Sequence, residues 1–382
     1  MAKKIFVLFP DGVGLRNFAF TNFKEVGEQQ GFEVIYWNHS VFPLQEQLGY
    51  KEVVLQNTQI HPKTATLSRA RKRVELALNR KRLKDPIYKT YRFPLRWKGL
   101  KNVMKSLFVS YHEQFSSTPK GWQNLMDAMH AAEKSTNRYQ ECLQQLREHQ
   151  PDLVFCTTQR ATQAIAPLLA AQELGIPTAC WVYSWDNLPK GMSTVETDYY
   201  FVWSQLMKEQ LLTYYPKVRA EQVFVTGTPQ FEPHYDTSLL QTREAFCESH
   251  GLDAQKRYVC FSGDDQTTSP LDQYYLEDVA KAVRKLNDED FNLGVVYRQV
   301  PVDDSGRYDL VLEEYKDVIT SVKPLWKTMG SQWNEVMPTK EDFVRLVNTC
   351  HHCDLVVNIC SSMVFDFAIH HKPCIYPNYE QP

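Results

Sequence analysis

The chain has 382 residues, a net charge of only −2 and a hydrophobic content of 43%. This length is enough for about two domains, and the composition excludes a disordered chain. No stretch is long and apolar enough to span a bilayer. Nine cysteines without a sign of export predict reduced thiols in a cytoplasmic protein.

The first part of the chain alternates between predicted strands and helices. The apolar run Ile5–Phe9 predicts a first strand, because it is too short for a signal peptide and ends at Pro10. A glycine-containing loop over 11–17, a helix over 20–30 and a second strand over 33–37 follow. This unit is typical of nucleotide-binding folds. It lacks the third glycine of the dinucleotide fingerprint, which argues against NAD binding.

Residues 60–148 predict a mainly helical insertion, in which an amphipathic helix over 122–149 is stopped by Pro151. The segment Arg69–Lys105, here called the basic arm, carries fourteen Lys or Arg residues against two acidic ones, with aromatic residues between them. Two interpretations remain open: contact with an anionic membrane surface, or a solvated helical face packed on the first domain. Nothing else in the chain resembles a nucleic-acid fold, so we expect no nucleic-acid partner.

Further strands are predicted over 153–156, 177–183, 198–203 and 223–225, with a helix over 161–174 that Gly175 caps. Strands that alternate with helices predict a mainly parallel sheet covered on both faces. One loop of this region, Ser184–Gly191, follows a strand directly. Trp185 could stack on a sugar there, while Asp186 and Asn187 could bond its hydroxyls. The alternative is a structural loop with an Asx-turn.

A second sheet is predicted from strands over 258–262, 293–298, 318–321, 355–359 and 374–376. Its first strand ends at Ser262 and Gly263, where small residues would let a phosphate approach the backbone; an ordinary turn explains them equally well. We expect the following acidic pair, Asp264 and Asp265, to face water and not to bind a metal.

Arg298 ends the next strand of this second sheet. Its guanidinium could pair with a phosphate. The alternative is a salt bridge to Asp303 or Asp304, which follow a few residues later.

The segment Cys350–Cys353 contains two cysteines and two histidines, and more cysteine and histidine residues follow it. This grouping invites a zinc interpretation. Structural zinc sites usually take four ligands from two knuckles, and no second Cys-x-x-Cys pair exists. We therefore expect no metal site, with these cysteines packing as small hydrophobes.

The pattern with most information lies near the end of the chain. The buried strand predicted over Leu355–Ile359 is followed by Ser361 and Ser362, and then by a helix that carries Asp366 in its first turns. Serine hydroxyls and the N–H groups of a helix N-terminus bind phosphates in open α/β sheets. Asp366 would orient a ribose or a sugar. The alternative is a helix cap, with Asp366 complementing the helix dipole.

This strand–Ser-Ser–helix unit resembles the donor-binding segment of glycosyltransferases with the GT-B fold, in particular bacterial surface-polysaccharide and CDP-glycerol polymerase-like transferases. The segment Val225–Phe231 resembles the GT-B hinge region, and Ser184–Gly191 resembles a loop of surface-glycan transferases. The resemblance implies an α/β protein with two Rossmann-like domains that face each other across a cleft. The acceptor domain would cover 1–227, with a basic helical insertion at about 60–150, and the nucleotide-donor domain 228–382. Because only six residues follow Tyr376, we expect the second domain to be trimmed or short.

The resemblance also implies a function: metal-independent transfer of a sugar, or a sugar-like phosphorylated unit, from a nucleotide-activated donor to a cell-surface glycan or lipid-linked acceptor. The nucleotide sugar is a substrate, so we expect no cofactor. The expected base that activates the acceptor is Asp11, with Asp186 and His112 next; the alternative is that Asp11 is a turn residue that bonds its own backbone. Trp185 and Asn187 would bind the acceptor. A nucleotide-sugar 2-epimerase and a non-catalytic GT-B relative that binds glycan or nucleotide are the alternatives.

The expected donor-binding residues are Gly227, Thr228, Ser262, Gly263, Arg298, Ser361, Ser362 and Asp366.

Overall fold

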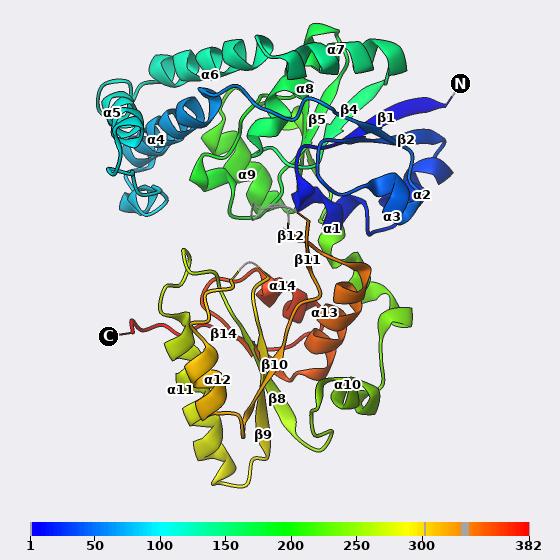
Figure 1. Cartoon of the computed structure of the whole chain (residues 1–382), viewed down its shortest axis with the longest axis vertical. Helices are drawn as coiled ribbons and strands as arrows, with labels where there is room; N and C mark the ends of the chain where they lie inside the picture. The colour runs from blue at the N-terminus through cyan, green and yellow to red at the C-terminus, as the bar shows by residue number, and fades with distance from the viewer. Residues whose placement is uncertain (1, 302, 330–335, 382) are drawn as a thin grey trace. The chain divides into compact units, whose positions relative to one another are not determined.

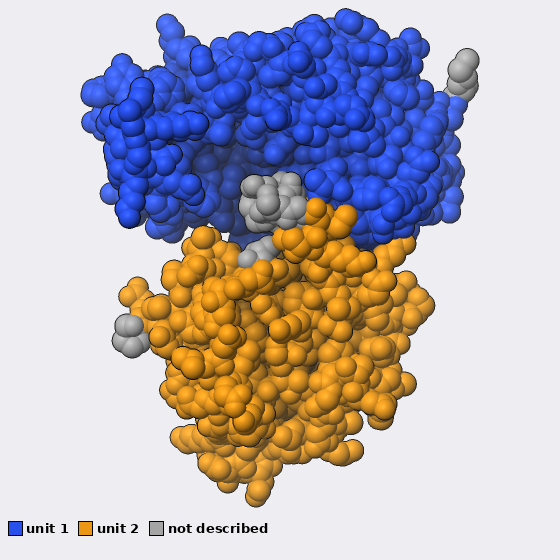
Figure 2. Space-filling view, in the orientation of Figure 1, with its two compact units in different colours: residues 1–228 blue, residues 229–382 orange. Residues whose placement is uncertain are grey.

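The computed structural model describes residues 2–301, 303–329 and 336–381. The chain divides into two compact units, Met1–Thr228 (unit 1) and Pro229–Pro382 (unit 2), which are blue and orange in Figure 2. Each unit is built around its own parallel sheet with helices on both faces (Figure 1).

Unit 1 contains a seven-stranded parallel sheet in the order β3-β2-β1-β4-β5-β6-β7. Its interior strand β1 has a run of four fully buried residues, Phe6–Phe9. Such a continuous apolar run is expected for a parallel strand that is covered on both faces. The strands are β1 (Lys3–Phe9), β2 (Phe32–Asn38), β3 (Glu52–Val54), β4 (Leu153–Cys156), β5 (Thr178–Trp181), β6 (Tyr199–Val202) and β7 (Val223–Val225).

Helices of unit 1 belong to two groups. Those that connect strands are α1 (Leu15–Phe18), α2 (Phe23–Gln29), α3 (Leu44–Leu48), α8 (Ile165–Glu173) and α9 (Gln205–Tyr214). The insertion between β3 and β4 consists of α4 (Thr64–Leu83), α5 (Leu100–Phe115), α6 (Pro119–Lys134) and α7 (Asn137–His149).

One expectation for this insertion was wrong. The single amphipathic helix predicted over 122–149 is two helices, α6 and α7. Thr136 is the N-cap of α7, and its side chain accepts a hydrogen bond from the backbone N–H of Tyr139. A capping hydroxyl satisfies an N–H group that the start of a helix leaves without a partner, so a new helix begins at this point.

Unit 2 contains a five-stranded parallel sheet in the order β10-β9-β8-β13-β14. Its strands are β8 (Arg257–Ser262), β9 (Leu293–Arg298), β10 (Ile319–Val322), β13 (Leu355–Val357) and β14 (Cys374–Ile375). A separate antiparallel ribbon pairs β11 (Lys327–Thr328) with β12 (Val336–Met337). The helices are α10 (Arg243–His250), α11 (Asp272–Asn287), α12 (Asp309–Glu314), α13 (Lys340–His352) and α14 (Met363–Ile369).

The core of unit 2 has one apolar cluster on each face of the sheet. One cluster joins the sheet to α11 and α12, and the other joins it to α10, α13 and α14. Cys350 and Cys353 are fully buried in the second cluster. These two thiols therefore pack as small apolar groups.

Both sheets share a topological feature that matters for ligand binding. The strand order reverses between β1 and β4 in unit 1, and between β8 and β13 in unit 2. Ligands of open α/β sheets bind at such switch points, outside the carboxyl ends of the strands. The topology thus marks the loops after β1, β4, β8 and β13 as the places to look for a site.

Candidate functional site

The switch point of unit 2 brings together two of the serines expected in the donor site. Ser262 is the last residue of β8, and its hydroxyl donates a 3.2 Å hydrogen bond to the hydroxyl of Ser361, in the loop after β13. The Ser361 hydroxyl also accepts a 3.3 Å bond from the backbone N–H of Met363, the first residue of α14. Ser362 occupies the N-cap position of α14, and in the described structure its side chain makes no capping hydrogen bond.

Gly263 is packed closely against two tyrosine side chains. A Cβ atom there would lie 3.1 Å from the ring of Tyr297 and 3.2 Å from the hydroxyl of Tyr308. The backbone N–H of Gly263 also donates a 3.0 Å bond to the carbonyl of Arg298. A side chain at this position would therefore displace one of the two tyrosines by a few tenths of an ångström.

Asp264 is buried, so the expectation that it faces water was wrong. Its carboxylate accepts a 2.9 Å hydrogen bond from the backbone N–H of Cys360. The pKa of Asp264 is raised to about 6, mainly by burial and also by the Asp272 and Asp265 carboxylates, while the N–H of Cys360 acts in the opposite direction. Asp265 behaves as a turn residue, because its carboxylate accepts bonds from the backbone N–H groups of Thr267 and Thr268.

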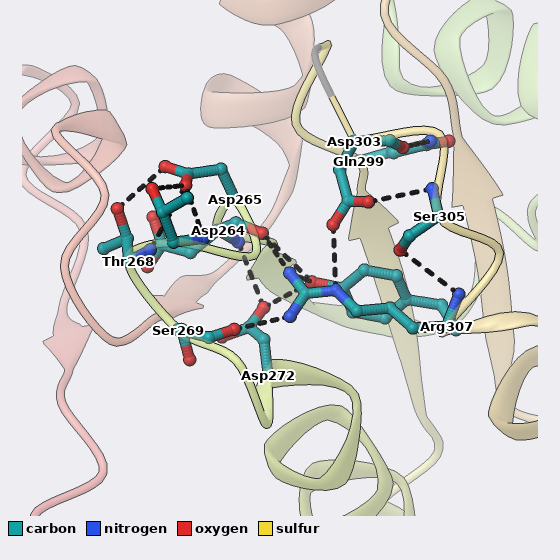
Figure 3. Close-up of polar contacts among 11 residues, drawn as sticks. Asp264, Asp265, Thr268, Ser269, Asp272, Gln299, Asp303, Ser305 and Arg307 are labelled. Atoms are coloured by element: carbon teal, nitrogen blue, oxygen red, sulfur yellow. Dashed lines mark hydrogen bonds and ion pairs between the residues drawn. The ribbon is translucent and has the colours of Figure 1, made fainter. Parts of the chain in front are cut away.

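Arg307 joins two loops of this region (Figure 3). Its guanidinium donates to the backbone carbonyls of Asp264 and Ser269 in the β8–α11 loop, and it pairs with the Asp303 carboxylate at 2.8 Å. Nothing in the sequence analysis had singled out Arg307. The signal that could have found it is its position four residues after Asp303.

A buried carboxylate lies beneath this loop. The fully buried Asp272, at the start of α11, accepts bonds from the backbone N–H of Asp264 at 3.0 Å and from the hydroxyl of Tyr308 at 2.6 Å. Burial raises the pKa of Asp272, although these hydrogen bonds oppose the shift. Two carboxylates with raised pKa values therefore lie at the end of β8.

Arg298 has a different partner from the two that we considered. One nitrogen of its guanidinium, Nη2, donates to both carboxylate oxygens of Asp342 on α13, at 2.7 and 2.9 Å. Asp303 pairs with Arg307 instead. The other terminal nitrogen of Arg298, Nη1, is buried and has no hydrogen-bond partner in the described structure. This nitrogen could bind a phosphate without breaking the pair with Asp342.

Asp366 is almost completely buried on α14, where it contacts a histidine pair. Its carboxylate lies 2.9 Å from Nε2 of His234, and Nδ1 of His234 lies 3.0 Å from Nε2 of His370. Burial and the neighbouring charges of His234 and His351 lower the pKa of His370 to about 4. Sequence analysis missed His234, because it precedes Asp366 by 132 positions and no local pattern links them.

Asp11 lies at the switch point of unit 1, in the loop directly after β1. Its carboxylate accepts a 3.0 Å hydrogen bond from the backbone N–H of Val13. Burial raises the pKa of Asp11, while the charge of Arg160, in the loop after β4, acts in the opposite direction. Gly14 allows close packing here, since a Cβ atom would lie 2.4 Å from the Thr157 hydroxyl oxygen.

Asp186 organises the loop after β5. It accepts hydrogen bonds from the Ser184 hydroxyl at 2.6 Å and the Asn187 amide at 3.1 Å, and it pairs with Lys190. Burial alone would raise the pKa of Asp186, but the bonds from Lys190 and Ser184 outweigh it and the pKa is lowered. Asn187 is buried in this arrangement, whereas Trp185 is 43% exposed.

The remaining expected residues lie elsewhere. Gly227 and Thr228 are the last two residues of unit 1, and Gly227 has a φ of +74°, which suits a chain turn. His112 lies on α5, where its ring nitrogen contacts the Ser116 hydroxyl at 3.0 Å. Within the described residues, no group of three or more His, Cys, Asp or Glu side chains is placed to hold a metal ion.

Unit 1 also has a cavity of about 580 Å³ that the sequence did not predict. It lies between α4, α6 and the segment after α9, and none of the expected site residues lines it. Its walls include Leu78, Asn79, Trp122, Tyr214, Tyr215 and Lys217.

Comparison with known proteins identifies the fold. No protein-family model and no curated protein sequence matches the chain. Among solved structures, the chain is similar to Staphylococcus aureus MnaA in a co-structure with UDP, with a TM-score of 0.52 and 14% identity over 98% of this chain and 78% of that one. A Listeria monocytogenes protein assigned as a UDP-N-acetylglucosamine 2-epimerase gives 0.54 and 13%, over 98% and 79%.

A third similar structure is described as a glycosyltransferase. This protein, from Rickettsia africae, gives a TM-score of 0.50 at 10% identity, over 98% of this chain and 79% of that one. Identities this low establish the fold alone. The chain therefore has the GT-B fold that these nucleotide-sugar epimerases and glycosyltransferases share.

Proposed function

We propose that the chain binds a nucleotide-activated sugar in unit 2 and transfers the sugar, or a sugar-like phosphorylated unit, to a glycan or lipid-linked acceptor. The observation that carries this proposal is the hydrogen bond between Ser262 and Ser361, which joins the ends of β8 and β13 at the switch point. Hydroxyl groups and the start of α14 meet there, where open α/β sheets bind phosphates.

The chemistry of sugar transfer sets what this site must do. Negative charge develops on the diphosphate as it leaves, so preorganised donors that face it would lower the barrier. The hydroxyls of Ser361 and Ser362 and the unpaired Nη1 of Arg298 are the groups that we assign to this task. We propose that they act without a metal ion, so activity should survive EDTA. Complete loss that manganese or magnesium restores would contradict this part.

Asp11 is the base that we assign to the acceptor side. A general base works best when its pKa lies near the working pH, and burial shifts the pKa of Asp11 in that direction. Asp186 is a poorer base, because its pair with Lys190 lowers its pKa. The finer assignment, to surface-polysaccharide transferases of the CDP-glycerol polymerase-like kind, rests on the sequence resemblance.

A nucleotide-sugar 2-epimerase is the second candidate. One structure similar to this chain is described as a UDP-N-acetylglucosamine 2-epimerase, and another was determined with UDP. Epimerisation must remove the proton from C2 of the sugar and return it on the other face, which calls for acid/base groups on both sides. Of the two carboxylates that we expected on the acceptor side, only Asp11 has a raised pKa. We place transfer first because of the sequence resemblance of the strand–Ser-Ser–helix unit. A non-catalytic binding partner remains the third candidate.

Titration calorimetry with UDP, CDP, ADP and GDP tests the nucleotide site. We expect one diphosphate to bind well, and Ser361→Ala with Ser362→Ala to weaken it by about 1–3 kcal/mol without changing nucleoside binding. The matched control is Ser238→Ala with Ser321→Ala, two exposed serines of unit 2 outside the switch point. Unchanged diphosphate affinity in the folded site variant would sink the assignment, and no binding at all would favour the non-catalytic candidate.

Transfer and epimerisation differ in their need for an acceptor. A transferase should release nucleotide at an appreciable rate only when an acceptor glycan is added. An epimerase should invert the C2 configuration of the nucleotide sugar without any acceptor, which NMR of the sugar would detect.

A further inference from the structure

The helix α5 of unit 1 carries a stripe of exposed apolar side chains. Residues three or four positions apart on a helix lie on the same face, and the large apolar residues of α5 recur at this spacing. Their exposed fractions are 79% for Leu100, 64% for Met104, 56% for Leu107, 59% for Tyr111 and 70% for Phe115. A continuous apolar surface of this kind on a folded protein usually marks an interaction site.

The other face of α5 is the one that packs on the protein. Val109 is almost fully buried, and Glu113 pairs with Arg73 at 2.9 Å and with Arg92 at 2.7 Å. The helix is therefore fixed to α4 by one face, and the stripe lies on the face that remains. Its exposure follows from how α5 is anchored.

The surroundings of the stripe are positively charged and aromatic. Lys98, Lys101 and Lys105 are exposed, and none of them forms an ion pair within the described part of the chain. Phe93 and Trp97, in the segment before α5, are each 55% exposed. Apolar and aromatic residues beside unpaired lysines are the pattern of helices that lie in the headgroup region of a membrane.

We propose that the apolar stripe of α5, from Leu100 to Phe115, docks on an anionic phospholipid surface, with Lys98, Lys101 and Lys105 against the lipid phosphates. This inference goes beyond the proposed nucleotide chemistry and does not depend on it. The three lysines favour an anionic partner surface over a neutral apolar one, because a neutral partner would leave their charges unpaired beside the stripe. Within the described ranges, no helix has the length and apolar character of a membrane span. The contact that we propose is at the membrane surface.

Vesicle co-sedimentation of the full chain tests the proposal. We expect binding to vesicles that contain phosphatidylglycerol, much weaker binding to phosphatidylcholine alone, and loss of binding as salt is raised. Leu100→Gln with Leu107→Gln should lower the partition coefficient roughly tenfold or more, because two leucine side chains no longer enter the apolar layer. Both positions are exposed, so the fold should be retained, as circular dichroism would check.

Two matched controls separate the stripe from general surface effects. Leu206→Gln with Leu310→Gln replaces two equally exposed leucines on α9 and α12 and should leave vesicle binding unchanged. Replacing Lys98, Lys101 and Lys105 by Gln should remove the preference for anionic lipid. The same change at Lys285, Lys323 and Lys340, three exposed lysines of unit 2, should not.

Three results would overturn the proposal. The first is equal binding to neutral and anionic vesicles, or no binding at low salt. The second is a stripe variant that binds like the wild type. The third is that the stripe variant loses a self-association that the wild type shows in analytical ultracentrifugation, while the two proteins bind vesicles equally. This face would then be a contact between two copies of the chain.

Discussion

Asp264 illustrates how burial changes the chemistry of one carboxylate. Its sequence neighbour Asp265 sits in a turn, accepts several hydrogen bonds and has a lowered pKa, because those bonds outweigh burial. Asp264 accepts one backbone bond, lies close to Asp272 and has a pKa of about 6. The two residues are adjacent in sequence, and only the fold distinguishes them.

The raised pKa of Asp264 predicts how stability depends on pH. Between the unfolded pKa of 3.8 and the folded value of about 6, the folded state holds more protons, so stability falls as pH rises. Above this window the ionised carboxylate costs about 3 kcal/mol as an upper bound. Asp264→Asn should therefore raise the free energy of unfolding at pH 8 and change it little near pH 4.

Urea unfolding of the full chain at both pH values measures this effect. Asp265→Asn is the control, and it should be neutral or destabilising at pH 8, because the bonds that Asp265 accepts favour its charged form. If Asp264→Asn is less stable than the wild type at pH 8, the raised pKa is wrong.

The role of Asp11 is tested by a substitution that keeps its shape. In Asp11→Asn the amide oxygen can still accept the bond from the Val13 N–H, so the turn should be retained. If Asp11 is the base, turnover should fall by roughly 10²–10⁴-fold while nucleotide affinity stays near the wild-type value. Steady-state kinetics and calorimetry on the same samples decide this. Near-normal turnover would move the role to Asp186.

At the scale of elements, the strands were the most predictable part. The predicted spans 153–156, 223–225 and 293–298 coincide with β4, β7 and β9. Apolar runs between polar turns are a strong signal where a parallel sheet is covered on both faces. The shortest strands were missed: β3 has three residues and β11 has two, too few for a pattern, and pairing with a neighbouring strand defines them.

Contacts between loops were the least predictable part. Arg307 connects the loop after β9 to the loop after β8. Arg298 pairs with Asp342 on α13 and not with Asp303 or Asp304, the two acidic partners that we considered as the alternative to a phosphate. Propensity and spacing describe neighbours along the chain. These pairs join residues dozens of positions apart, so only the packed structure could select among several acidic candidates.

The Arg307 contacts predict a local effect of its removal. Arg307→Gln should leave the Asp303 charge unpaired and lower stability by roughly 3 kcal/mol, as for other buried ion pairs that lose one partner. Hydrogen exchange should become faster in the segment 264–269, whose carbonyls Arg307 binds. The matched control is Arg284→Gln, which removes a more exposed pair with Asp317 and should cost much less. Equal effects of the two substitutions would contradict the role of Arg307 in joining the two loops.

At the scale of the whole molecule, the sequence predicted two α/β halves with the site at strand ends, and the GT-B fold is confirmed. The Ser361 and Ser362 pattern also led to a real meeting point of two loops. It did not predict that Asp366 faces His234 inside unit 2, or that Gly263 serves packing. Local patterns pointed to this meeting point of two loops, whereas burial and long-range pairs determine what each side chain can do there.

The central claim is that a nucleoside diphosphate binds at the switch point of unit 2. Hydrogen exchange of the full chain, with and without saturating UDP or whichever diphosphate binds best, tests it most directly because no residue is altered. We expect slower exchange in the loops over 262–268 and 358–364, with little change in the loops after β1 and β4. Protection confined to unit 1, or none in either loop of unit 2, would contradict the claim.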